Sequence, residues 1–147
     1  MLLVVSNTLR HTKSISDVVR DLSLALSFFD SPRALSAQMR GTTRRIFLLG
    51  KDDVNPDIIK RLKAHQGRVP FAFIIAADRA AVSPMVDADL LDSLLEFPNF
   101  EWLGANFDVF SLGDSLKRVR SRMLQFTREQ IEAAFDNFEF AVRYQPK

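Results

Sequence analysis

Short apolar runs alternate with segments of helical period along this chain, and this alternation restricts its fold more than any other feature. Residues 2–6, LLVVS, form a continuously apolar run, which is typical of a strand buried on both faces of a parallel sheet. Further runs occupy residues 25–30, 45–50, 71–76 and 100–104. Between them, apolar residues recur at helical spacing. We therefore predict an α/β three-layer sandwich, in which a five-stranded parallel sheet carries helices on both faces.

Polar residues and prolines at the expected helix starts support this division. Serine, asparagine and aspartate accept hydrogen bonds from the first free N–H groups of a helix, and proline suits its first turn. The expected caps are Ser14 with Asp17, Ser31 with Pro32, Asn55 with Pro56, Asp87, and Ser111 with Asp114.

The composition excludes several classes of protein. A chain of 147 residues has room for one compact domain and a tail. The absence of cysteine and the isolation of His11 and His65 exclude a disulfide framework and a thiolate or histidine metal site. A net charge of +2 does not indicate nucleic acid. The opening MLLVV is too short for a membrane span and lacks a basic leader, so we expect a cytoplasmic protein with no membrane partner.

The order and number of these strand and helix units resemble the receiver domain of bacterial two-component response regulators over residues 1–124. The resemblance implies a flavodoxin-like sheet with a site at the carboxyl ends of its strands. In that family an acidic pair after the first strand holds Mg²⁺, and the third strand ends in the aspartate that accepts phosphate. The fourth strand ends in Ser or Thr, and a Lys-Pro pair follows the fifth.

The residues at the corresponding places of this chain have different chemistry. They are Ser6 and Asn7 after the first strand, Gly50 at the end of the third, Ala76 or Ala77 at the fourth, and Ala105-Asn106 at the fifth. Phosphoryl transfer to a carboxylate needs the carboxylate and a divalent cation. We therefore predict a degenerate phosphoacceptor pocket, with no catalytic residue, metal site or cofactor in this chain.

Four aspartates near strand ends offer alternatives. Asp52 lies two residues beyond Gly50, which would place it on the same face of an extended strand. Because no acidic partner follows the first strand, we interpret Asp52 as a solvated acid. Asp30, Asp78 and Asp108 also follow strand ends, where aspartate commonly serves turns and caps.

The last part of the chain predicts a second unit. Thr127 to Gln130 have the spacing of a capping box, so we expect a new amphipathic helix there. The run REQIEAAFDNFEFAVRYQPK resembles the entrance of EAL-type cyclic-di-GMP phosphodiesterase domains, where a helix leads into a first barrel strand ending in YQP. The matching residues are Ile131, Ala134, Phe135, Glu139, Phe140, Tyr144, Gln145, Pro146 and Lys147.

The EAL resemblance divides the chain into a receiver-like domain, residues 1–124, and the linker helix and first strand of a truncated EAL domain, residues 125–147. It implies a parent phosphodiesterase that uses Mg²⁺ or Mn²⁺, with Gln145 near the substrate of an intact barrel. Its metal-binding residues would lie beyond Lys147. The chain itself would then be no enzyme.

These features together predict a phosphorylation-independent regulatory or dimerisation domain, with the EAL domain in cis. A homodimer is expected through the fourth helix, fifth strand and fifth helix, a region that contains Phe97, Phe100, Phe107, Phe110, Lys117, Arg118, Arg120 and Arg122. These residues could equally fill the core and form a solvated helix face. The alternative function is a receiver-like input domain of a transcription regulator. A flavodoxin-like enzyme is disfavoured because NTLRHTKS, after the first strand, contains no glycine.

Overall fold

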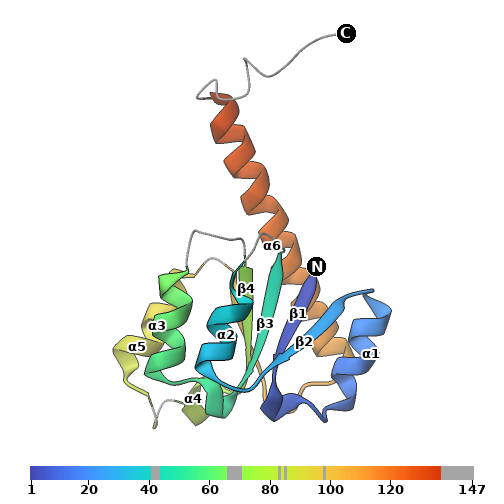
Figure 1. Ribbon diagram of the computed structural model, residues 1–147, viewed down its shortest axis with the longest axis vertical. Coiled ribbons are helices and arrows are strands. Elements are labelled where there is room, and N and C mark those ends of the chain that lie inside the picture. Colours follow the sequence, from blue (N-terminus) through green and yellow to red (C-terminus); the bar gives the residue numbers. More distant parts are fainter. Residues whose placement is uncertain (41–43, 66–70, 83, 85, 98, 137–147) are drawn as a thin grey trace.

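The five predicted strands form one parallel sheet. The computed structural model describes residues 1–40, 44–65, 71–82, 84, 86–97 and 99–136, with side chains up to Met123 and at Glu132. The strand order is β2-β1-β3-β4-β5 (Figure 1), which confirms the α/β prediction and is the flavodoxin-like order. The strands are β1 (Leu2–Ser6), β2 (Ala25–Phe29), β3 (Arg45–Gly50), β4 (Phe71–Ala76) and β5 (Phe100–Leu103).

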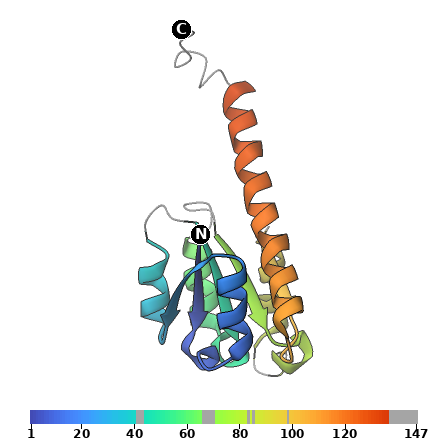
Figure 2. The same ribbon diagram turned by 90° about the vertical axis from the view of Figure 1, so that its right-hand side faces the viewer.

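Helices cover both faces of this sheet (Figures 1 and 2). One face is covered by α1 (Lys13–Asp21) and α6 (Val109–Asp136). The other is covered by α2 (Pro32–Gln38), α3 (Pro56–Ala64), the short α4 (Arg79–Val82) and α5 (Ala88–Asp92). Three short 3₁₀ turns complete the described elements: η1 (Asn7–Leu9), η2 (Lys51–Asp53) and η3 (Ser93–Glu96).

The interior residues of the central strands β1, β3 and β4 are apolar because successive side chains enter two different cores. In β3, Phe47 and Leu49 pack toward α2 and α3, whereas Ile46 and Leu48 pack toward α1 and α6. All four are at most 1% exposed. A strand with both faces buried has no position for the polar residues that alternate in half-exposed strands.

Three of the predicted caps are confirmed by their hydrogen bonds. The Ser31 hydroxyl accepts from the Ala34 N–H at 3.1 Å, and the Asn55 side chain accepts from the Ile58 N–H at 3.0 Å. Asp87 accepts from the Asp89 N–H at 3.3 Å. Each satisfies an N–H that the helix itself leaves free.

The two other predicted caps are wrong. The N-cap position of the first helix is Thr12 rather than Ser14, because the Thr12 carbonyl already accepts from the Ile15 N–H and Ser14 lies within the first turn; the Thr12 side chain makes no capping hydrogen bond. The last begins at Val109, with Asp108 as its cap. Asp108 accepts from the Ser111 N–H at 2.8 Å and its own N–H donates to the Ser111 hydroxyl at 2.9 Å, which is a reciprocal capping box.

The predicted helix start at Thr127 is also wrong. The backbone is continuously helical from Val109 to Asp136, 28 residues, and both views show α6 projecting beyond the sheet. The chain has no glycine or proline between Asp114 and Asp136, so nothing interrupts the helix and frees the N–H groups that a cap would bind. The EAL-like strand and Gln145 lie outside the described residues.

Within the described part of the chain, no helix is both long enough and apolar enough to cross a membrane.

Ser23 ends α1 in an unfavourable backbone conformation, which gives a testable prediction. Its φ is 52°, and the Ser23 and Leu24 N–H groups bond back to the Arg20 and Val19 carbonyls, the pattern of a Schellman motif. Glycine adopts this conformation without steric cost. We expect Ser23→Gly to raise the free energy of unfolding in urea by about 0.5–1 kcal/mol.

A substitution to glycine within α1 itself provides the control. Ser14→Gly should lower the free energy of unfolding by about 0.5 kcal/mol, because Ser14 has helical geometry. Equal destabilisation by both substitutions would contradict the assigned role of Ser23.

Candidate functional site

The carboxyl ends of β1, β3 and β4 meet at the edge where a receiver-like site is expected. Gly50 pairs with Ala76, and Ala76 pairs with Leu103. Ser6, the last residue of β1, is 1% exposed. The structure therefore places Gly50 beside Ala76, with Ser6 at the end of the strand on the other side of β3.

The space in front of Gly50 is already filled by the protein. A Cβ atom at Gly50 would lie 2.8 Å from Thr8 Oγ1 and 3.3 Å from Asp53 Oδ2. The Gly50 backbone is extended, with a φ of −90° that any residue adopts. Close approach of Thr8, rather than backbone conformation, is what makes a side chain at position 50 unfavourable.

Hydrogen bonds hold the Thr8 and Asp53 side chains in front of Gly50. The Asp53 carboxylate accepts from the Gly50 N–H at 2.8 Å and from the Thr8 hydroxyl at 3.4 Å. The hydroxyls of Thr8 and Ser6 share a hydrogen bond at 2.9 Å, and the Thr8 N–H donates to the Ser6 hydroxyl at 3.3 Å. We call Ser6, Thr8, Gly50 and Asp53 the strand-end cluster. It ties η1 to η2 across the edge of the sheet.

Sequence reasoning did not identify Thr8 and Asp53 as members of this site. Asp53 lies three residues after Gly50, the spacing at which a side chain can bond back to the backbone where a helical turn starts. That spacing was a usable signal. The contact of Thr8, 45 positions from Asp53 in the chain, depends on how β1 and β3 pair and has no local pattern.

Two predicted pocket residues lie at the periphery. Asn7 is exposed and its side chain accepts from Arg10 at 3.4 Å. Ala105 lies in an exposed turn after β5, one residue beyond Gly104. A Cβ at Gly104 would lie 3.4 Å from Asp78 Oδ1, an ordinary contact.

The residues at this edge do not fit a bound Mg²⁺. An octahedral Mg²⁺ site needs carboxylate oxygens, and the Asp53 carboxylate already accepts hydrogen bonds from Gly50 and Thr8. Asp52 is exposed in η2. Among the described residues, no group of three or more His, Asp or Glu side chains is arranged to hold a metal ion.

The other aspartates near strand ends are exposed, and one has a structural role. Asp30 and Asp78 are exposed. The hydrogen bonds from the backbone and hydroxyl of Ser111 lower the pKa of Asp108 below its ordinary value. Its carboxylate serves the start of α6 as an ionised cap.

Of the aromatic residues expected on a dimer face, one is buried and two are partly buried against the core. Phe97 is 6% exposed and meets Phe73 edge to face, with 4.9 Å between ring centroids. Phe100 stacks on Phe73 at 4.9 Å, and Phe107 packs against the α1/α6 core. Phe110, in contrast, is 81% exposed.

The basic residues of α6 are partly engaged within the chain. Glu101 of β5 accepts from the Ser115 hydroxyl at 2.9 Å and from Arg118 at 2.7 Å, and it lies 3.5 Å from the Arg122 guanidinium. Lys117 and Arg120 are exposed. The face formed by α5, β5 and α6 is thus less available for a partner than its composition suggested, and the homodimer stays a proposal.

Comparisons with solved structures identify the fold. A response regulator from Thermotoga maritima superimposes with a TM-score of 0.56 and 12% identity, over 82% of this chain and 96% of that one. The chemotaxis protein CheY4 of Vibrio cholerae gives 0.53 and 14%, over 80% and 96%. A fusion that carries a trimeric coiled-coil segment from yeast gives 0.57 and 10%, over 97% and 88%.

The chain therefore has the fold of response-regulator receiver domains. At these identities the likeness extends to the fold alone. No protein-family profile and no curated protein matches this chain.

The packing around Gly50 leads to a testable prediction. Gly50→Ala should lower the free energy of unfolding by about 1–3 kcal/mol, because the new Cβ displaces Thr8 from its hydrogen bonds. In Thr8→Ala the obstructing oxygen is gone. The double variant should therefore be more stable than the sum of the single effects implies, by at least about 0.5 kcal/mol.

Gly104→Ala is the matched control for this cycle. It lies at the same edge, its Cβ would make only an ordinary contact, and its effect should stay within about 0.5 kcal/mol. Urea unfolding of the wild-type chain, the two single variants, the double variant and Gly104→Ala measures all these values. A Gly50→Ala variant as stable as Gly104→Ala would show that the space in front of Gly50 is open.

Proposed function

We propose that this chain is a receiver-like regulatory domain that works without aspartyl phosphorylation. One observation carries the proposal: the strand end that would hold a phosphate-accepting aspartate is Gly50, and Thr8 and Asp53 close the space in front of it. Such a domain acts through the surface it presents rather than through a switched state.

The electrostatics of phosphoryl transfer support the same conclusion. Charge on the transferring group must be neutralised by a divalent cation and by positive groups placed around it. At this edge the neutral Ser6 stands where an acidic residue would be needed to hold the cation, and Ala76 stands where a hydroxyl-bearing residue would be needed. Asp53 supplies the carboxylate of the strand-end cluster, and that carboxylate accepts a hydrogen bond from the Gly50 N–H.

We further propose that the parent protein carries an EAL-type phosphodiesterase domain after this one, with Mg²⁺ or Mn²⁺ as its cofactor. The support is the resemblance of residues 128–147 to the entrance of that family. The continuity of α6 to Asp136 would connect the two domains physically. In an unbroken helix, the packing of the first half against the sheet determines where the far end lies.

Phosphate transfer to the chain is the direct test. With acetyl [³²P]phosphate and Mg²⁺, the chain is expected to take up no label, whereas a receiver domain with its acidic pair intact is labelled in the same assay. Label that appears on this chain and is lost in Asp52→Asn, but kept in Asp30→Asn, would overturn the proposal.

Cyclic-di-GMP turnover tests the proposed neighbour. In the parent protein with Mg²⁺ or Mn²⁺, we expect turnover to change when residues 1–124 are removed. Inserting two alanines after Thr127 should also change it, because this rotates the neighbour by roughly 200° about α6. A seven-residue helical insertion restores the phase to within roughly 20° and is the control.

The absence of both hydrolysis and cyclic-di-GMP binding in every form of the parent would refute the EAL proposal. The transcription-regulator function would then take its place.

A further inference from the structure

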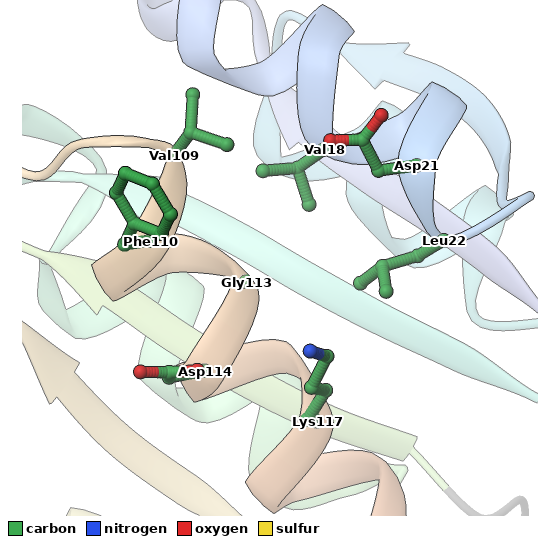
Figure 3. A pocket seen from close by; sticks show the side chains of 8 residues that line it. All are labelled: Val18, Asp21, Leu22, Val109, Phe110, Gly113, Asp114 and Lys117. Atoms are coloured by element: carbon green, nitrogen blue, oxygen red, sulfur yellow. The ribbon is translucent and has the colours of Figure 1, made fainter.

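A groove between α1 and α6 combines a hollow with an exposed aromatic side chain. Its volume is about 200 Å³. Figure 3 shows Val18 and Leu22 pointing from α1 toward α6, and Lys117 pointing from α6 toward α1. The α1/α6 groove is lined by Val18, Asp21, Leu22, Val109, Phe110, Gly113, Asp114 and Lys117.

Phe110 is exposed in a way that the fold of the chain does not require. It is 81% exposed, and it is followed one turn later by Gly113. The other large hydrophobic residues exposed among the described side chains are Leu26 and Leu95, at 37% and 65%. A phenylalanine ring carries about 150–250 Å² of surface that is stabilised by burial.

Gly113 is equally unexplained by contacts within the chain. Among natural residues only proline is less favourable than glycine inside a helix. A Cβ at Gly113 would meet no atom within 4 Å, so neither crowding nor a left-handed backbone demands glycine there. Its effect is to leave the surface of α6 open beside Phe110, where another helix could approach closely.

We infer that this groove is a self-association surface, in which Phe110 of each copy enters the α1/α6 groove of a second copy. In the proposed dimer the two-fold axis passes between Gly113 and Asp114, the midpoint of Phe110 and Lys117 on α6. Two antiparallel copies of α6 crossing there place each Phe110 against Lys117 of the other copy. An isologous contact of this kind closes after two subunits.

The chemistry of the opposed residues is complementary. An ammonium group over an aromatic face is attracted by the ring, and the four-carbon stem of Lys117 covers its edge. Val18 and Leu22 supply the apolar floor. Asp21 and Asp114 line the groove together with Lys117, so a second copy brings charges of both signs.

This inference names a second copy of the chain as the partner of the regulatory domain proposed above. It rests on that proposal only for its biological role. It also moves the expected dimer contact from α5 and β5 to α1, while keeping α6. Its residues are separate from those of the strand-end cluster, so the two proposals can fail independently.

Sedimentation equilibrium of the 147-residue chain tests the contact. The wild-type chain is expected to dimerise at concentrations of about 100 µM or below. Phe110→Ser, which removes the inserted ring, and Gly113→Leu, which fills the hollow, should each weaken the dimer by about tenfold or more. Leu95→Ser is the matched control, because Leu95 is an exposed leucine of η3 that does not line the groove.

Mixing the two variants gives the sharpest result. The Phe110→Ser chain keeps its hollow and the Gly113→Leu chain keeps its ring, so a mixed dimer regains one of the two contacts. The mixture should associate more tightly than either variant alone. A mixture that associates no more tightly than the two variants do separately would overturn the inference.

Other outcomes are also decisive. A wild-type chain that stays monomeric at about 100 µM, or a dimer that Leu95→Ser weakens as much as Phe110→Ser, overturns the inference. Labelling by acetyl phosphate, measured on the same samples, distinguishes the proposals. A monomer without label contradicts only the contact, and a labelled dimer contradicts only the phosphorylation-independent function.

Discussion

The burial of both faces of the parallel sheet is the constraint on which the rest of the structure depends. Since α1 and α6 cover one face and α2, α3 and α5 the other, the central strands β1, β3 and β4 have little room for polar side chains outside their ends. Backbone groups within the sheet are paired in the ladder, but those at its carboxyl edge are not. The edge is therefore where side chains must supply hydrogen bonds, and where function in such folds is concentrated.

The strand-end cluster is one solution to that requirement. In this chain the Asp53 carboxylate accepts the N–H of Gly50, and Thr8 links Asp53 to Ser6. The groups that would otherwise be free to bind a phosphate or a metal are engaged with each other. A cluster satisfied in this way favours one arrangement of η1 and η2, whereas a switch needs two arrangements of similar free energy.

The sequence predicted the strands closely and the site only in part, for physical reasons. Strands such as β3 and β4 are specified by local apolar runs, and caps such as Ser31 and Asn55 by their own side chains. The Thr8 contact arises from pairing of distant strands and had no local pattern. The capping-box spacing at Thr127 misled because the residues after Thr127, Arg128 to Gln130, are also good helix formers, and only a break in the backbone distinguishes a new helix from a continuing one.

The anchoring of α6 explains why one helix can serve both the domain and whatever follows it. Leu112, Leu116, Val119 and Met123 are buried to within 1% and recur at the spacing of a single helix stripe. That stripe fixes the rotation and the height of α6 on the sheet. Beyond this stripe the helix continues to Asp136 without a break, so the same rotation and height determine the position of its far end. A contact at the start of α6, beside Phe110, would thus constrain the position of the far end as well, without any change at the strand-end cluster.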